Sequence, residues 1–277
     1  MTFPVKKRSI DGAMLAYRAA GNLAARPIML IHGLTGSSAD WESTAGALAP
    51  AGWRVIAPDC PGHGDSFAPT EPGDYELGRV ADLLHRLAAE LAQVPAIMVG
   101  NSMGGAIAQE YAIKHGHDVS ALVLVDSAGD MRRPIARPAG HQEFVEREFK
   151  TGLEGGMEAI WELHQEARGW MYAGDLRPDF RERMKARICR TSAYGYLYSD
   201  RALGNRRKTL ANLAPLKMPT LVMCCEHEGA MLKQVSEDLA SAIPGARSET
   251  IPDAWHQPQL ENPAAFNEIL LRFLGTL

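Results

Sequence analysis

One serine in the chain has the setting that nucleophilic catalysis requires. Ser102 lies in the stretch VGNSMGGAIA (99–108), with Gly100 two positions before it and Gly104 two positions after it. An apolar run typical of a buried strand (96–99) precedes it, and a segment with helical character follows. Paired glycines permit a sharp strand-to-helix turn that would expose the serine hydroxyl at the carboxyl edge of a sheet. The pattern favours a nucleophile, whereas the ordinary role of a serine at a helix start is an N-cap.

The candidate general base is His256, in the stretch IPDAWHQPQLENP. It is the only one of nine histidines that follows the last expected strand (248–251), and an amphipathic helix comes after it. Neutral imidazole can take the proton of a serine and later deliver it to a leaving group. The alternative is a histidine that only satisfies hydrogen bonds within its loop.

Three carboxylates could orient that histidine and stabilise its charged form. Glu228 follows the apolar run TLVMCC, and Asp126 ends the preceding apolar run ALVLVD. Asp253 is a weaker candidate because it lies only three residues before His256. We predict Glu228 as the acid, with Asp126 as the alternative.

Backbone amides could complete an oxyanion site. The loop IHGLTGSSADW follows another apolar run, and its Gly33 permits close backbone approach. The amides of Leu34 and of Met103, at a helix start, could then point at one oxygen atom. Thr35 and Ser37 could add hydroxyl donors.

The elements that must position these residues follow from hydrophobic period. Residues 5–19 predict two short strands around an Asp11-Gly12 turn. From Pro27 onward, short apolar runs alternate with longer segments of helical period. Continuous apolar runs are typical of strands buried on both faces. The chain is therefore predicted to be an α/β protein whose sheet is mostly parallel and covered by helices on both sides.

One long segment interrupts this alternation. Between ALVLVD and the strand that begins at Thr220, residues 130–215 have helical periods and many aromatic and charged residues. We expect a helical cap over 130–215, and a core formed by 1–129 and 216–277. The segment carries 16 of the 29 Lys and Arg but 12 of the 33 Asp and Glu, so its net charge is +4 against −8 for the rest. It could attract an anionic substrate, but a solvated basic surface is the favoured interpretation.

Composition excludes several classes of protein. A net charge of −4 and a pI near 6.1 give no basic footprint for nucleic-acid binding. The N-terminus offers no apolar run long enough for a signal peptide or membrane anchor, so a cytoplasmic location without membrane partners is expected. Four cysteines without paired CxxC spacing predict neither disulfide nor metal site. A small-molecule substrate is the expected partner, and a homodimer stays open.

Taken together, these motifs resemble the α/β-hydrolase fold superfamily. The resemblance covers the chain from about residue 5 to its end and rests on HGLTG, RVIAPDCPGHGDS, GNSMGG, LVMCCEHEGAM and DAWHQPQLENPAAFNEILLRFL, in that order. It implies an eight-stranded, mostly parallel sheet with a helical cap inserted after the sixth strand. It also implies Ser102 as nucleophile, His256 as base and the position of Glu228 as acid, without a cofactor.

Two positions depart from the family pattern. Glu228 stands where the family more often has Asp, so either the histidine loop shifts or the acid role passes to Asp126. Trp255 stands where a small residue usually precedes the histidine, and it is expected to shape the pocket. His63, in PGHGDS, is expected to be structural.

The serine also indicates the subclass. Haloalkane dehalogenases and epoxide hydrolases of this fold carry Asp there, so the resemblance favours esterases, enol-lactonases, perhydrolases and meta-cleavage-product hydrolases. The HGGGPG-like loop of the last group is absent, so we expect hydrolysis of a small ester, lactone or amide through an acyl-enzyme. The alternatives are carbon-carbon bond hydrolysis of the meta-cleavage-product type and a non-catalytic small-ligand receptor on the same fold.

Cap residues should set the substrate. Trp161 and His164 recur at helical spacing, in a pattern more often found in packing than in pocket lining, and Arg168 follows them. These three and Trp255 are the expected substrate-binding residues. Arg168, Arg132 and Arg133 could grip a carboxylate.

Overall fold

A computed structural model of the chain describes residues 3–129, 140–169, 171, 178–206 and 210–277. It begins with the predicted hairpin of β1 (Val5–Ile10) and β2 (Ala13–Ala20). Asp11 and Gly12 form its turn with φ angles of 49° and 83°, the positive values that match the twist of paired strands.

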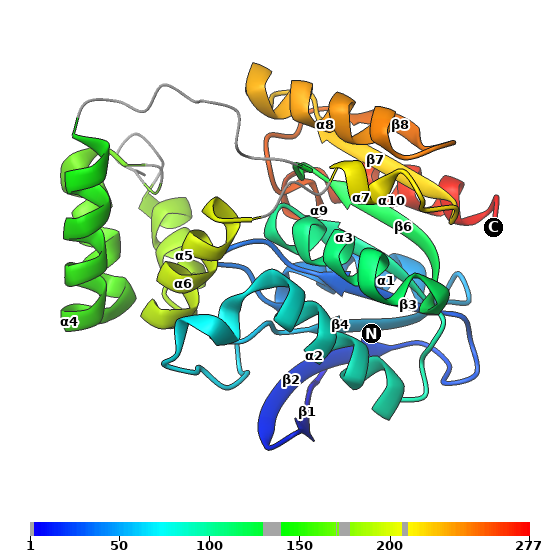
Figure 1. Cartoon of the computed structure of the whole chain (residues 1–277), viewed down its shortest axis with the longest axis horizontal. Coiled ribbons are helices and arrows are strands. Elements are labelled where there is room, and N and C mark those ends of the chain that lie inside the picture. The colour runs from blue at the N-terminus through cyan, green and yellow to red at the C-terminus, as the bar shows by residue number, and fades with distance from the viewer. Residues whose placement is uncertain (1–2, 130–139, 170, 172–177, 207–209) are drawn as a thin grey trace.

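Eight strands form one sheet in the order β1-β2-β4-β3-β5-β6-β7-β8 (Figure 1). The remaining strands are β3 (Pro27–Ile31), β4 (Arg54–Pro58), β5 (Ala96–Asn101), β6 (Val119–Val125), β7 (Thr220–Cys225) and β8 (Arg247–Ile251). β2 runs antiparallel to β1 and β4, and every other pair is parallel. The predicted mostly parallel, eight-stranded sheet is confirmed.

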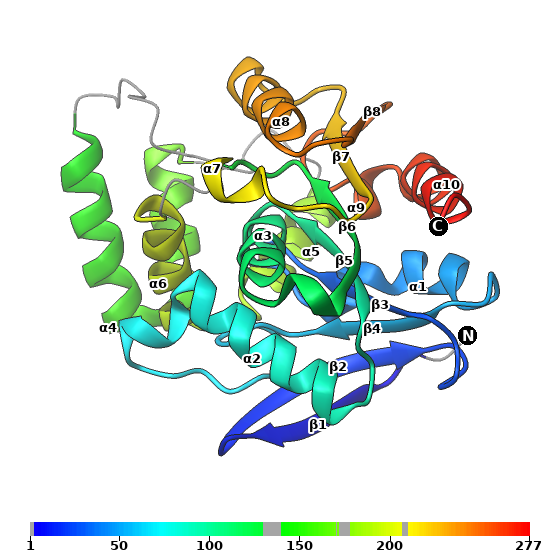
Figure 2. The same ribbon diagram turned by 45° about the vertical axis from the view of Figure 1, so that its right-hand side comes forward.

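Helices cover both faces of this sheet (Figure 2). One face carries α2 (Leu77–Glu90), α3 (Met103–His115) and α8 (Ala230–Ala242), and the other carries α1 (Glu42–Leu48) and α10 (Pro263–Leu274), which α9 (Pro258–Glu261) precedes. Successive side chains of β5 pack on opposite faces of the sheet. Met98 belongs to the apolar core on the side of α2, α3 and α8, whereas Ile97 and Val99 belong to the core on the side of α1 and α10. This two-sided burial explains why the central strands read as continuous apolar runs.

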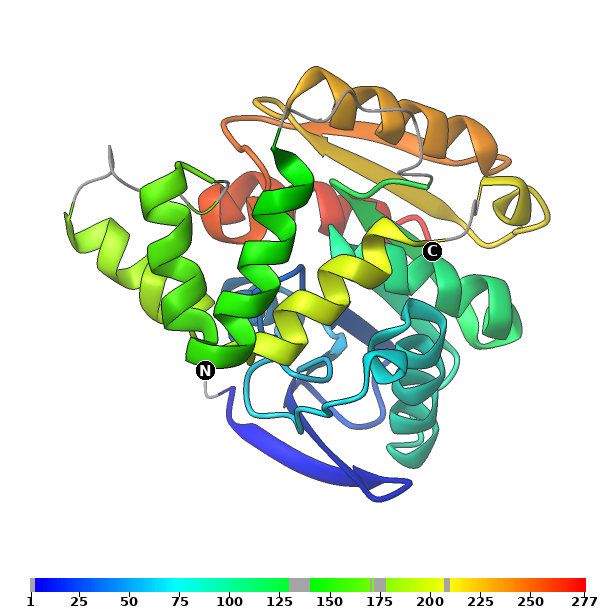
Figure 3. The same cartoon turned by 60° about the vertical axis from the view of Figure 1, so that its left-hand side comes forward.

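The insertion between β6 and β7 is helical in the residues that the structure describes (Figure 3). It contains α4 (His141–Ala167), α5 (Pro178–Ile188), α6 (Ala193–Gly204) and the short α7 (Leu210–Leu213). α4 is kinked at Gly156, whose φ of 71° no helix can hold. α4 to α6, which we call the cap helices, share an apolar cluster that includes Trp161 and Tyr196. α7 contacts α3 and α8.

Among the described helices, none combines the length and apolar character needed to cross a membrane.

Candidate active site

Ser102 occupies the predicted turn between β5 and α3. Its backbone has φ 53° and ψ −114°, a conformation that costs a non-glycine residue about 1–3 kcal/mol. A Cβ on Gly104 would lie 2.1 Å from the Ile31 carbonyl oxygen, and one on Gly100 would lie 2.2 Å from the Gly104 carbonyl oxygen. Both glycines are therefore required by the close approach of strand and helix.

The structure brings Ser102, His256 and Glu228 together, although they come from three different loops. Ser102 Oγ lies 3.0 Å from His256 Nε2. On the other side of the ring, His256 Nδ1 contacts Glu228 Oε1. With the ring proton on Nδ1, the imidazole donates to the carboxylate and accepts from the serine hydroxyl. This is the order of contacts that activates a serine.

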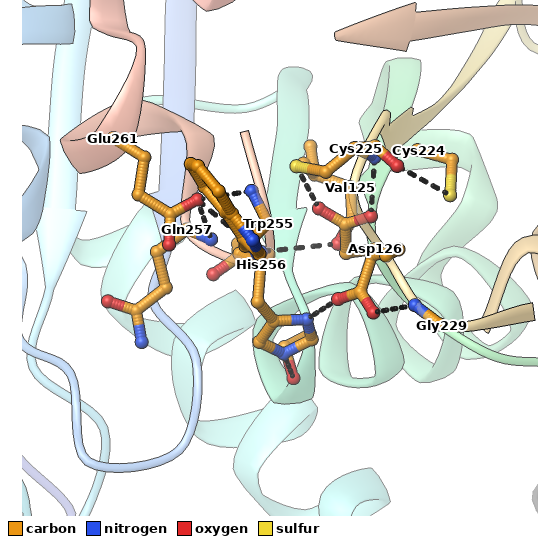
Figure 4. Close-up of polar contacts among 12 residues, drawn as sticks. Val125, Asp126, Cys224, Cys225, Gly229, Trp255, His256, Gln257 and Glu261 are labelled. Carbon is orange, nitrogen blue, oxygen red and sulfur yellow. Dashed lines mark hydrogen bonds and ion pairs between the residues drawn. The ribbon is translucent and has the colours of Figure 1, made fainter. Parts of the chain in front are cut away.

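The loop that carries His256 is fixed by two residues that the sequence analysis did not single out. Glu261 Oε2 accepts hydrogen bonds from the backbone N–H groups of Trp255, His256 and Gln257 at 2.7, 3.1 and 3.2 Å (Figure 4). Asn101, directly before the serine, donates from Nδ2 to the His256 carbonyl at 2.9 Å. The strand end before the nucleophile thus also holds the histidine loop.

The surroundings of His256 shift its proton equilibrium. Burial alone would lower the pKa of His256, but the hydrogen bond to Glu228 and the charges of Glu228 and Asp126 outweigh burial and raise it. The carboxylates therefore favour the imidazolium, the species that would form when the ring takes a serine proton.

Asp126, the alternative acid, lies beside this pair but has other partners. Its Oδ1 accepts from the Cys225 N–H at 2.8 Å, and its Oδ2 accepts from Cys225 Sγ at 2.7 Å. Burial raises the pKa of Asp126 to about 6, although both Cys225 hydrogen bonds lower it. Glu228 makes the direct contact with His256, and its Oε2 also accepts from the Gly229 N–H at 3.0 Å. The longer glutamate side chain thus reaches the histidine.

The two amides expected at the oxyanion site flank the serine turn. Gly33 lies against Ser102, since a Cβ built on Gly33 would be 3.3 Å from the serine Cβ. The Gly36 N–H donates to the Gly33 carbonyl at 3.0 Å and closes a turn that does not use the amide of Leu34. Met103 is the first residue of α3, so its N–H has no acceptor within the helix. That the amides of Leu34 and Met103 point at one oxygen atom stays a prediction.

Two buried histidines near this loop, His32 and His63, have surroundings typical of structural residues. His32 donates from Nδ1 to the Gly33 carbonyl at 2.8 Å, and its Nε2 accepts from the Cys60 N–H at 3.0 Å. Burial, followed by the charge of His32, lowers the pKa of His63 to about 3. His63 is therefore neutral at physiological pH.

The four residues expected to bind substrate fall into two groups. Trp161 and His164 are buried within the cap helices, and His164 Nε2 donates to Glu148 Oε1 at 2.6 Å. Arg168 ends α4 in a left-handed conformation on the surface, and Trp255 is 58% exposed beside the ring of His227. Their part in binding stays a prediction.

Arg132 and Arg133, the other candidates for gripping a carboxylate, lie outside the described residues.

Two groups of potential metal ligands occur among the described residues. One is the trio of Asp126, Glu228 and His256, and the other comprises the exposed Glu226, His227 and Asp253; within each group the ligand atoms lie within 4.8 Å of one another. The first group is already linked by hydrogen bonds and charge. The expectation of no metal and no cofactor stays a prediction.

Comparison with known proteins agrees with this architecture. A family model for the alpha/beta hydrolase fold matches residues 26–263. A Bacillus subtilis protein that carries the name of a 2-succinyl-6-hydroxy-2,4-cyclohexadiene-1-carboxylate synthase is 26% identical over 275 residues, which cover 96% of this chain and 97% of that protein. Lipase 1 of Psychrobacter immobilis is 29% identical over 274 residues, 94% of this chain and 82% of the lipase.

Among solved structures, the enol-lactonase from Burkholderia xenovorans LB400 superposes with a TM-score of 0.80 at 25% identity, covering 98% of this chain and 100% of that chain. The likeness therefore extends through the cap as well as the sheet.

Proposed function

The chain belongs to the α/β-hydrolase fold family, and from this premise we propose that it is a serine hydrolase that cleaves a small ester, lactone or amide. The observation that carries the proposal is the continuous contact from Ser102 Oγ through the His256 ring to Glu228. Ser102, Glu228 and His256 follow β5, β7 and β8, so the three proposed catalytic groups come from loops after three different strands.

The first half of the reaction forms an acyl-enzyme. Ser102 Oγ attacks the substrate carbonyl carbon while His256 Nε2 takes the hydroxyl proton. Negative charge develops on the carbonyl oxygen, and the amides of Leu34 and Met103 stabilise it. The imidazolium then protonates the leaving group, whose bond to the carbonyl carbon breaks.

The second half returns the enzyme to its starting state. Water loses a proton to His256 and attacks the acyl carbon, and Ser102 leaves as the hydroxyl after receiving that proton back. Glu228 keeps the ring in the required tautomer throughout and stabilises its charge.

The relatives support an ester or lactone carbonyl as the reacting group. One is named a lipase and another an enol-lactonase, and both match over most of their length. The HGLTG loop fits this class, since an oxyanion site made of the amides of Leu34 and Met103 requires no further glycines.

Covalent labelling tests the proposal. Incubation with a fluorophosphonate should place one adduct on Ser102, found by mass spectrometry of the digested protein, and Ser102→Ala should abolish it. Heat-unfolded protein is the control, because the adduct requires the assembled triad. Folded protein that binds small molecules but gives no adduct would favour a receptor on this fold instead.

A further inference from the structure

A chain of buried polar groups connects the segment after α6 with the carbonyl group of Ser102. It begins at Arg206, whose side chain is 3% exposed. Arg206 Nη1 donates to the Ala128 carbonyl at 2.5 Å, and its Nη2 donates to Gln109 Oε1 at 2.8 Å. Its Nε lies 3.8 Å from Glu110 Oε1, so a carboxylate accompanies the buried charge.

Gln109, a fully buried residue of α3, links Arg206 to Ser127. Its Nε2 donates to Ser127 Oγ and to the Ala128 carbonyl, both at 3.3 Å. An amide oxygen only accepts and an amide nitrogen only donates. Because the guanidinium of Arg206 holds Oε1, Nε2 must point toward Ser127.

Ser127 completes the chain at the nucleophile. Its Oγ donates to the Ser102 carbonyl at 3.1 Å. Because Gln109 donates to the same oxygen, the hydroxyl proton of Ser127 is left for that carbonyl. A Cβ on Gly105 would lie 2.5 Å from the Ser127 Cβ, so this side chain fits directly against the first turn of α3.

The carbonyl that Ser127 holds belongs to a strained residue. The Ser102 backbone keeps its φ of 53° because surrounding groups fix it on both sides. Its N–H donates to the Val125 carbonyl at 2.8 Å, and its own carbonyl accepts from Ser127 and from the Ala106 N–H at 3.1 Å. Loss of one of these contacts would let the turn relax and would move Oγ relative to His256.

We propose that Arg206 is a positioning residue for the nucleophile, acting through Gln109 and Ser127 on the Ser102 carbonyl. The inference rests on the proposed function, because it concerns how Ser102 Oγ is aimed at His256. The side-chain contacts that carry the inference run from Arg206 to Ala128, Gln109 and Glu110. It ties the segment that returns from the cap helices to the geometry of the serine turn.

The test is the initial rate of fluorophosphonate labelling at Ser102, divided by the fraction of protein that is finally labelled, which gives the rate constant per competent site. Protein that cannot be labelled therefore does not lower this rate constant. Ser127→Ala and Arg206→Gln should each lower the rate constant about fivefold, the size expected for one hydrogen bond. The double variant should fall little further, because both changes break the same chain. Arg206→Lys, which keeps the charge and one donor, should recover part of the loss.

Arg190→Gln is the matched control, since Arg190 also lies in the cap segment but pairs with Asp65 on the surface at 3.1 Å. Its labelling rate should equal that of the unaltered protein. Unchanged rates in Ser127→Ala and Arg206→Gln, with only a lower Tm, would overturn the inference and leave a purely structural role. A loss of about 25-fold in the double variant, the product of the two single losses, would also overturn the inference, because the two residues would then act independently. Failure of the unaltered protein to label at Ser102 would instead contradict the proposed function, and the inference would fall with it.

Discussion

The loops at the carboxyl edge of the sheet and the cap helices use polar side chains differently. At the sheet edge, His256 contacts Ser102 on one side of its ring and Glu228 on the other, and hydrogen bonds between side chains and backbone groups hold the loops of His256 and Glu228. In the cap helices, Glu148 accepts from His164 and Tyr196 inside an apolar cluster. The first arrangement sets a serine hydroxyl beside an imidazole, whereas the second joins α4 to α6.

The contacts between these two regions give the basic cap segment a structural role. Arg187 on α5 donates from Nε and Nη2 to the two carboxylate oxygens of Asp40 at 3.0 and 2.6 Å. Asp40 also caps the short 3₁₀ helix that follows the HGLTG loop. Arg190 and Arg206 likewise reach partners in the core. Part of the positive charge in this segment therefore fastens the cap to the core.

The largest expected effect is a difference in kcat between variants of the two carboxylates at the sheet edge, Glu228 and Asp126. Glu228→Gln should lower kcat by about 10³- to 10⁴-fold, because the ring loses the partner that fixes its tautomer. Asp126→Asn should lower kcat less than about tenfold, since Asp126 bonds to Cys225. Steady-state hydrolysis of p-nitrophenyl acetate measures both. The opposite ranking in folded protein would assign the acid role to Asp126.

The ion pair between Arg187 in the cap helices and Asp40 in the core should contribute to the free energy of unfolding. Arg187→Gln should lower the free energy of unfolding by about 3 kcal/mol, because the buried Asp40 carboxylate loses its cation. Asp40→Asn in the same protein should recover part of that loss. Arg190→Gln, at an exposed ion pair, should cost less than about 1 kcal/mol. Urea unfolding measures all three, and equal costs for the two arginines would refute the distinction.

The pH dependence of activity sharpens the account of the sheet edge. The proposed mechanism requires neutral His256, so kcat/KM should be lost as pH falls through the pKa of this group. Since the net effect of the surroundings raises that pKa, the inflection should lie above the ordinary histidine value of 6.5. In Glu228→Gln the residual activity should inflect at a lower pH. The carboxylate that opposes the effect of burial on the pKa of His256 is then gone. An inflection below 6.5 in the unaltered protein would contradict the proposed role of Glu228.

The smallest expected effect lies within the cap helices. Tyr196→Phe removes a hydroxyl that donates to Glu148 at 2.7 Å and should cost about 1 kcal/mol of stability. The value of kcat should stay unchanged, since this hydroxyl bonds to Glu148 within the cap helices, and only the apolar part of the cluster packs against Leu34. Tyr198→Phe, on the same helix, is the control, because Tyr198 contacts the rings of Tyr75 and Tyr194. A fall in kcat for Tyr196→Phe alone would show that the cap cluster also serves the chemistry.

The fold was predictable because it depends on local pattern. Continuous apolar runs mark strands buried on both faces, and parallel strands end at one edge, so Ser102, His256, Glu228 and Asp126 were all expected at that edge. The pattern could not decide which of the two carboxylates contacts His256, because both follow strands that end there. Asn101 and Arg206 were missed because their roles arise from packing between distant segments, and Glu261 was missed because its role depends on the exact path of the loop that precedes α9. Asn101, for example, bonds to a residue 155 positions away.

The cap was predictable only in outline. Helical period and length indicated helices over the insertion, but the pairing of Glu148 with His164 depends on how α4 bends at Gly156. The adjacent glycines in LEGGM were the one local signal for that bend. Which side chains line a substrate pocket depends on how the cap helices close, and no local pattern determines this.

The most direct test of the central claim compares the unaltered protein with Ser102→Ala in the hydrolysis of p-nitrophenyl acetate. We expect turnover in the unaltered protein and a loss of at least about 10³-fold in Ser102→Ala, with the same Tm and the same circular dichroism spectrum. Equal hydrolysis by both proteins would show that Ser102 is not the nucleophile.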